Sequence, residues 1–270
     1  MESRKNSCPP KTELSNKSIS SELLIEYLSG IKGRVGIAFS GGADSTYLLR
    51  IAKDACRGRV VPFLLVSPFL SERERTWAHR VADEIGITFR ELHWQPFDFH
   101  CIWGNGKDRC YYCKYVMYSK LWSVCREYGI SNLLDGTQLD DIGSDRPGLK
   151  AIRELSVKIP LVYCNLNKNN IRILSYKLCL PTWDRRSQSC LATRVAEGTF
   201  ITQNLLEKIE NAEELLRDFN IRNAKLRVDA NRTHLEILEE ERFYVEGRWP
   251  EIKGHLQDIG FHYLYLGIKV

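Results

Sequence analysis

Over residues 35–136 of this 270-residue chain, short apolar runs alternate with stretches in which apolar residues recur at helical spacing. The predicted strands are Val35–Phe39, Val60–Ser67, Thr88–His93 and Asn132–Gly136. The predicted helices between them cover Tyr47–Ala55, Trp77–Ile85 and Tyr112–Tyr128. Strands that alternate with helices form a parallel sheet with crossover connections. The sequence therefore predicts an α/β fold with a doubly wound parallel sheet, whose ligands bind at the carboxyl ends of the strands.

Beyond Pro181 the pattern changes to that of a small α+β domain. A long amphipathic helix is followed by a predicted hairpin, a further helix and a last strand, at Leu205–Phe219, 224–240, Glu251–Asp258 and His262–Val270. The polar, Ser-rich start offers too little apolar area to order itself. We expect a flexible tail over 1–20, the α/β domain over 21–184 and a smaller domain over 185–270, which serves substrate binding or oligomerisation.

Composition limits the partners of the chain. Its 39 Lys and Arg residues against 34 Asp and Glu give a charge of +5 without any long basic block, which favours a small anionic ligand and disfavours a nucleic-acid partner. No apolar run approaches the roughly 20 residues of a membrane helix, and no signal peptide is recognisable. We therefore expect a cytoplasmic protein, without a membrane partner, whose nine cysteines are reduced by default.

The segment SGGADS, residues 40–45, follows the first predicted strand and opens the first predicted helix. Gly41 and Gly42 allow a tight turn whose N–H groups point at one ligand, beside the positive end of a helix. The segment is neither the Walker pattern nor the dinucleotide Gly-x-Gly-x-x-Gly. It predicts a phosphate site, and the simpler alternative is an ordinary Gly-rich turn with Ser45 as the helix cap.

The same six residues match the Ser-Gly-Gly-x-Asp-Ser loop of the PP-loop ATP pyrophosphatases, which cleave ATP between its α and β phosphates. The resemblance implies ATP as cosubstrate, phosphate binding by Ser40, Gly41, Gly42 and Ser45, and Mg²⁺ binding by Asp44.

A second group of polar residues, in LLDGTQLDDIGSDRPGLKAIRE, follows the strand at Asn132–Gly136. Its residues suit ribose, phosphate and metal binding. We expect Gly136 and Thr137 to contact ATP, Asp141 to join Asp44 at Mg²⁺, and Arg146 to neutralise a substrate phosphate. A solvated acidic loop is the alternative.

Two cysteine sites stand out. In DRCYYCK, Cys110 and Cys113 lie at a predicted helix start between Arg109 and Lys114, an environment that lowers the pKa of a thiol. One of the two is therefore a candidate sulfur carrier, and half of a zinc or iron–sulfur site or plain structural thiols are the alternatives.

Cys190 is the second site, with Arg185, Arg186 and Arg194 near it in the sequence. The arginines favour a thiolate, and Arg109 and Arg194 could equally hold a substrate phosphate. A structural cysteine at a domain boundary is the alternative.

The segments SGGADS, RCYYCK, LLDGTQLDD, LNKNNIR, LPTWD and CLATR together resemble the LarE family of ATP-dependent sulfur transferases over about residues 20–266. The resemblance implies adenylation of a pyridinium carboxylate, sulfur insertion in which some members sacrifice the cysteine matching Cys190, and a homo-oligomer. The family's Ser-Arg-x-Pro-Tyr-Gly reads Thr193-Arg194-Val195-Ala196-Glu197-Gly198 here, a departure that leaves the substrate open.

From these patterns we predict an ATP-dependent sulfur transferase that adenylates an oxygen of a small nucleotide-like substrate. The first hypothesis is thiolation of the 6-oxo group of guanine nucleotide, with sulfur carried as a persulfide on Cys113 and supplied by a protein such as a cysteine desulfurase. The alternatives are LarE-type insertion into a pyridinium carboxylate from Cys190, and a non-catalytic nucleotide-binding module. An iron–sulfur cluster at Cys110 and Cys113 is possible but not favoured.

Overall fold

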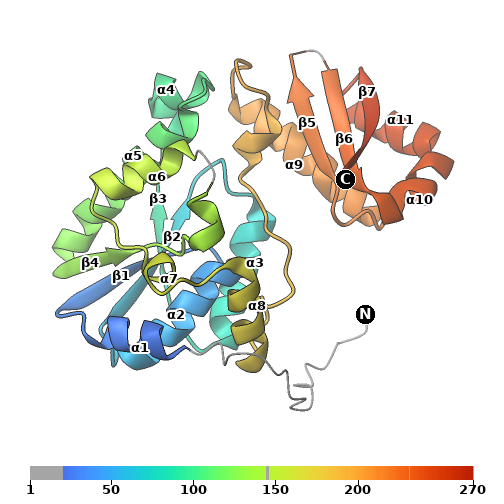
Figure 1. Cartoon of the computed structure of the whole chain (residues 1–270). Coiled ribbons are helices and arrows are strands. Elements are labelled where there is room, and N and C mark those ends of the chain that lie inside the picture. The colour runs from blue at the N-terminus through green and yellow to red at the C-terminus, as the bar shows by residue number, and fades with distance from the viewer. Residues whose placement is uncertain (1–20, 144–145, 231, 270) are drawn as a thin grey trace.

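The central element of the structure, a computed structural model, is a sheet of four parallel strands (Figure 1). The structure describes residues 21–143, 146–230 and 232–269; the tail predicted over 1–20 lies outside them. The strands are β1 (Arg34–Phe39), β2 (Val60–Val66), β3 (Arg90–His93) and β4 (Ile130–Leu134), in the order β3-β2-β1-β4. Each lies within a few residues of a predicted strand, and the order is compatible with the predicted doubly wound fold.

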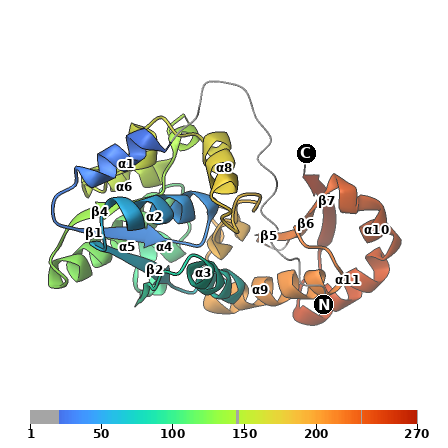
Figure 2. The same cartoon turned by 90° about the horizontal axis from the view of Figure 1, so that it is seen from below.

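Helices cover both faces of this sheet because its strands carry apolar side chains on both sides. One face packs against α1 (Glu22–Ser29), α2 (Ala43–Ala55), α3 (Glu72–Glu84), α7 (Pro160–Tyr163) and α8 (Lys168–Lys177). The other packs against α5 (Arg109–Glu127) and α6 (Pro147–Glu154). In Figure 1, α1, α2 and α8 lie below the sheet and α5 lies above it, and Figure 2 looks from below onto the first of these layers.

The order of the strands creates a crevice between β1 and β4. The chain runs from β1 outward through β2 to β3, then crosses to the opposite side of β1 to form β4. Loops after two strands that lead in opposite directions diverge, and ligands of doubly wound sheets bind in the space between them. Ser40 follows β1 and Asp135 follows β4, so both predicted nucleotide segments flank this crevice.

The C-terminal part is a second α/β unit. Its helices are α9 (Gln203–Asp218), α10 (Arg242–Gly247) and α11 (Trp249–Ile259), and its strands are β5 (Lys225–Asp229), β6 (Arg232–Leu238) and β7 (Leu264–Lys269). The antiparallel β5–β6 pair confirms the predicted hairpin, and β7 pairs in parallel with β6.

One apolar cluster joins the two units. Ile102, in the short helix α4 (His100–Trp103), is fully buried in the same cluster as Leu206 and Ile209 of α9. The buried Asn105 side chain adds hydrogen bonds from Nδ2 to the carbonyl oxygens of Ala196 and Thr199, at 2.7 and 2.9 Å. The boundary between residues 184 and 185 stays a prediction, and the core extends across it.

No helix of the described ranges is both long and apolar enough to cross a bilayer. Free thiols, as predicted, are Cys56, Cys101, Cys110, Cys113, Cys125, Cys164 and Cys190. Cys179 is disulfide-bonded instead, which contradicts the expectation of a reduced thiol at this position.

Candidate functional site

The segment SGGADS forms a tight turn between β1 and α2. Gly41 has φ +68°, and a Cβ atom there would lie 2.8 Å from Cα of Ala78. Both the backbone angle and the contact with α3 therefore require glycine. Gly42 is the N-cap of α2 and leaves the first N–H groups of the helix free to face a ligand.

Two hydroxyl groups hold the turn in shape. Oγ of Ser45 lies 3.0 Å from Oγ of Ser40, accepts from the Ser40 N–H at 3.2 Å, and lies 3.3 Å from the Gly42 carbonyl oxygen. These bonds within six residues preorganise the loop before any phosphate arrives. The arrangement suits the predicted phosphate site, and Ser45 lies inside α2 rather than at its cap.

The chain after β4 packs directly on this loop. A Cβ atom on Gly136 would lie 3.0 Å from the Ser45 nitrogen, so glycine is needed for the close approach. Thr137 is buried, and its N–H donates to Oδ1 of Asp135 at 2.7 Å. Gly136 and Thr137 thus line the crevice where ATP binding is predicted.

Asp44 is a buried carboxylate in the crevice whose pKa is affected by four charged residues around it. Burial raises the pKa of its carboxyl group to about 6, Lys168 opposes this rise, and Asp141 adds to it. Its Oδ1 atom is buried without a hydrogen-bond partner among the described residues. A buried carboxylate oxygen without a donor suits a hard divalent cation. The residues present therefore fit the predicted Mg²⁺, held by Asp44 and Asp141.

Basic side chains that sequence reasoning did not assign also face Asp44. Lys168 and Arg172 of α8 both favour its charged form, and Nε of Arg172 is buried without a partner in the described part of the chain. Cations and orphaned donors around a phosphate loop suit the negative charge of ATP. The only signal in the sequence was their place in the LNKNNIR segment.

The linker after α8 returns to the phosphate loop through Arg185. Its guanidinium group stacks 4.3 Å from the Trp77 ring centre, pairs with Glu74 at 2.6 Å, and lies 3.4 Å from the Gly41 carbonyl oxygen. Trp77 donates to the same oxygen at 2.9 Å. Sequence reasoning grouped Arg185 with Cys190, and the structure places it on the loop instead.

Five residues further on, the linker brings Cys190 to the start of α5. Cys110 and Cys113 lie close enough to Cys190 that the charges of these thiols affect one another. Arg109 binds the two segments together, since it donates to the Ala192 carbonyl oxygen at 2.8 Å and lies 3.6 Å from Sγ of Cys110. The two cysteine sites predicted separately are therefore neighbours, and Cys110, Cys113 and Cys190 are called the cysteine cluster below.

The pKa shifts of the cluster differ from the expectation of lowered values. Burial raises the pKa of the Cys113 thiol to about 12, and the repulsion of Cys190 and Cys110 adds to the rise. Cys190 is exposed by surface area, but the protein around its thiol still raises its pKa, against the opposing effect of Arg109. We expected a lowered pKa at one thiol of the Cys110–Cys113 pair and at Cys190; the shifts at Cys113 and Cys190 contradict this for those two thiols, because desolvation outweighs the nearby cations.

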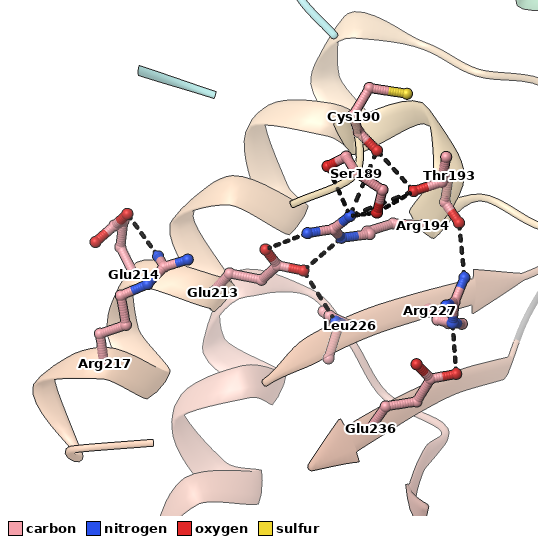
Figure 3. Close-up of polar contacts among 10 residues, drawn as sticks. All are labelled: Ser189, Cys190, Thr193, Arg194, Glu213, Glu214, Arg217, Leu226, Arg227 and Glu236. Atoms are coloured by element: carbon pink, nitrogen blue, oxygen red, sulfur yellow. Dashed lines mark hydrogen bonds and ion pairs between the residues drawn. The ribbon is translucent and has the colours of Figure 1, made fainter. Parts of the chain in front are cut away.

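Arg194 lies next to the backbone of Ser189 and Cys190, on the side away from the Cys190 thiol (Figure 3). It is 4% exposed and pairs with the equally buried Glu213 of α9 at 2.8 Å. It also donates to the carbonyl oxygen of Ser189 at 3.0 Å and to its hydroxyl at 2.6 Å. These protein partners occupy its guanidinium group, so the phosphate role predicted for Arg194 has no support. Its position instead fixes the backbone that carries Cys190.

The other two predicted phosphate ligands differ from each other. Arg109 uses its guanidinium group on Asn105 and Ala192, whereas Arg146 is exposed beside Asp141, with which it pairs. Within the described residues, no group of three or more His, Cys, Asp or Glu side chains is arranged to hold a metal ion. The iron–sulfur alternative therefore gains no support.

Fold and site together define an α/β protein with a glycine-rich loop after β1 that suits phosphate, and with a cysteine cluster at the start of α5. No family model matches the chain. An uncharacterised Synechocystis protein is 30% identical over 238 residues, 87% of this chain and 89% of the relative. The pyridinium-3,5-bisthiocarboxylic acid mononucleotide synthase of Lactiplantibacillus plantarum is 29% identical over 87% of this chain and 86% of its own.

An uncharacterised Methanocaldococcus jannaschii protein is 27% identical over 88% of this chain and 90% of its own. The chain belongs to the family of these relatives and is LarE-like.

Proposed function

We propose that the chain is an ATP-dependent sulfur transferase that inserts sulfur into the carboxylate of a pyridinium mononucleotide. The name of the Lactiplantibacillus plantarum relative supports this substrate class and the sulfur chemistry. The observation that carries the proposal is the linker, which contacts the phosphate loop through Arg185 and brings Cys190 to Cys110 and Cys113. An activating site and a sulfur site are thus joined by one short segment.

The first step of the proposed reaction is adenylation. A substrate carboxylate oxygen attacks the α phosphorus of ATP, the bond to the bridging oxygen breaks, and pyrophosphate leaves with the electron pair. The Gly41–Gly42 turn and the start of α2 would hold that pyrophosphate. Bound Mg²⁺, held by Asp44 and Asp141, would neutralise phosphate charge during the transfer.

In the second step, Sγ of Cys190 attacks the activated carbonyl carbon and AMP leaves. The thiol proton must depart first, and Arg109 and Arg194 favour the resulting thiolate. A base then removes the Cα proton of Cys190, the Cβ–Sγ bond breaks, and the product leaves as a thiocarboxylate. The protein would retain dehydroalanine at position 190, which makes this route stoichiometric.

The neighbouring thiols favour a second route for the same reaction. A persulfide on Cys190, formed by a donor such as a cysteine desulfurase, would attack the activated carbonyl carbon through its terminal sulfur, so that AMP leaves and an acyl disulfide forms. Cys110 or Cys113 would then attack Sγ of Cys190, release the thiocarboxylate and leave a protein disulfide. An external dithiol reductant would restore the two thiols, so this route can repeat.

The guanine hypothesis has gained no support from the relatives. Burial raises the pKa of both Cys113 and Cys190, but Cys190 is the more exposed of the two and lies in the CLATR segment that resembles the sacrificial position of the family. Cys190 is therefore the sulfur-bearing residue of the proposal, and Cys113 a resolving thiol at most.

Mass spectrometry after incubation with Mg-ATP and nicotinic acid mononucleotide tests the proposal. We expect pyrophosphate release, a thiocarboxylate product, and either loss of one H₂S from Cys190 or, with a persulfide donor present, a gain of one sulfur atom there. Cys190→Ser should abolish product but keep ATP binding, while Cys101→Ser, which removes a free thiol outside the cluster, should change nothing. Unaltered product formation by Cys190→Ser would contradict the proposal. Absence of pyrophosphate release would favour a non-catalytic module.

A further inference from the structure

The start of α5 and one side of α6 line an open cavity of about 570 Å³, to which no step of the proposed reaction has yet assigned a ligand. Its volume falls within the range of roughly 300–1,000 Å³ typical of small-molecule sites. The lining residues that matter are Asp108, Tyr111, Tyr112, Arg146, Lys150 and Arg153. Cations and aromatic rings therefore form its walls together.

The cations of the cavity come from one face of α6. Arg146 is the N-cap residue of α6, and Lys150 and Arg153, three residues apart inside the helix, lie on the same face. Lys150 has only a long contact of 3.9 Å with Glu154, and Arg153 has no ion-pair partner among the described residues. Since Asp108 is the one acid among the described lining residues, the cavity carries net positive charge.

Two tyrosine rings from the start of α5, Tyr111 and Tyr112, also line the cavity. The hydroxyl of Tyr111 donates to Glu154 at 2.7 Å, and Nζ of Lys150 lies 5.2 Å from its ring centre, so this ring is fixed in place. The hydrogen bond to Glu154 raises the pKa of Tyr111 to about 12, which keeps the phenol neutral. Tyr112 is 41% exposed. A fixed ring beside an open one is suited to a planar ligand.

The cavity adjoins both halves of the proposed reaction. Arg146 pairs with Asp141, one of the residues expected to hold Mg²⁺. Tyr111 directly follows Cys110 in α5. A ligand in the cavity would thus lie beside the metal side of the crevice, against the part of α5 that carries Cys110.

From this geometry we propose that the cavity binds the acceptor: a mononucleotide whose phosphate lies on Lys150 and Arg153 and whose planar ring lies against Tyr112. The proposal rests on the proposed function and assigns the substrate's own pocket. Lysine and arginine bind phosphate through charge-assisted hydrogen bonds, which are stronger than neutral ones. A cavity of this size suits one nucleotide rather than a polymer.

Calorimetric titration of the full chain with nicotinic acid mononucleotide tests the pocket without any turnover. We expect Lys150→Glu/Arg153→Glu to weaken binding by at least about tenfold, which corresponds to about 1.4 kcal/mol, since the variant loses two charge-assisted contacts to the phosphate and repels it. The matched control is Lys120→Glu/Arg126→Glu, which makes the same charge change at exposed positions of α5 outside the cavity. It should bind like the unaltered protein.

Two further measurements separate phosphate from ring recognition. The nucleoside without its phosphate should bind the unaltered protein and the Lys150→Glu/Arg153→Glu variant equally weakly, and Tyr112→Ala should weaken both ligands. ATP affinity should not change in any variant.

Full binding by the double variant, equal loss in the control, or no binding to the unaltered protein would overturn the pocket. Failure of the proposed function would be seen differently: the mononucleotide would bind with the expected dependence on Lys150 and Arg153, and no thiocarboxylate would form.

Discussion

The phosphate loop and the cysteine cluster are built in opposite ways. The loop lies within one strand–turn–helix unit, and the hydroxyls of Ser40 and Ser45 define its shape through bonds inside six residues. The cluster joins the start of α5 to the linker before α9, so no local interaction can form it. A motif whose hydrogen bonds lie within a few residues can be predicted from the sequence. A site assembled from distant segments cannot, because its geometry depends on tertiary packing.

The largest effect is expected at Arg194, beneath the cluster. Removal of one member of a buried ion pair leaves the other charge without compensation and costs about 3–5 kcal/mol. Because Arg194 and Glu213 are each 4% exposed, Arg194→Ala should lower the free energy of unfolding by this amount in urea denaturation. ATP should still bind to the folded fraction, because the phosphate loop does not depend on this pair.

A double-mutant cycle provides the control for this prediction. Arg194→Leu/Glu213→Leu removes both charges and should cost less than the sum of the two single changes. Strict additivity would mean that the pair does not fix the cysteine-bearing backbone, and the contrast between the two sites would then lose its physical basis.

The next largest loss of stability is expected for Gly41→Ala, in the phosphate loop. The positive φ and the 2.8 Å approach to Ala78 together should cost about 2–4 kcal/mol, and pyrophosphate release should be lost. Gly58→Ala is the matched control, since Gly58 has φ +77° but nothing within 4 Å of its added Cβ. It should show only the backbone cost of about 1 kcal/mol. Equal losses in the two variants would exclude the contact with α3 as a cause.

Periodicity and turn chemistry predicted the parallel strands, the major helices and the C-terminal hairpin. They did not predict α6 or α8, because Pro147 and the polar LNKNNIR segment obscure short helices whose formation depends on tertiary packing. Charges near in sequence were also misleading. Arg194 does lie beside Cys190, but its guanidinium group pairs with Glu213, whereas Arg185 contacts Gly41 instead.

The effect of burial on the pKa of Cys113 could not be predicted from the sequence either, because it also depends on tertiary packing. The cations flanking Cys113 are visible in the sequence, but the apolar cluster that covers its thiol and raises its pKa comes from segments far along the chain.

Asp44→Asn tests the charge at the loop through its pH dependence. The pKa of the folded Asp44 carboxyl, about 6, lies above the 3.8 of a free aspartate, so the folded protein binds this proton more tightly than the unfolded chain. Ionisation therefore destabilises the fold as pH rises from about 4 to 6, by up to about 3 kcal/mol above that range. Denaturation at a series of pH values should find the asparagine variant more stable at pH 7 and equal to the unaltered protein near pH 4.

Mg-ATP should reverse this order, because it stabilises the folded protein with the Asp44 carboxylate as one of its metal ligands, and the variant has lost that ligand. A stability difference that does not change with pH would contradict the assigned pKa.

The smallest effect is expected at Arg185, where the two regions meet. Arg185→Lys keeps the charge but loses the planar group that stacks on Trp77 and reaches Gly41. We expect a stability loss of about 1 kcal/mol, weaker ATP binding, and faster alkylation of Cys190 by iodoacetamide, because the linker loosens at both ends. Arg186→Lys is the control, as Arg186 is exposed and has only a 3.4 Å contact with the exposed Glu240. If Arg185→Lys changed ATP binding but left Cys190 alkylation as it was, the linker would hold the loop alone, and the two sites would be neighbours without being coupled.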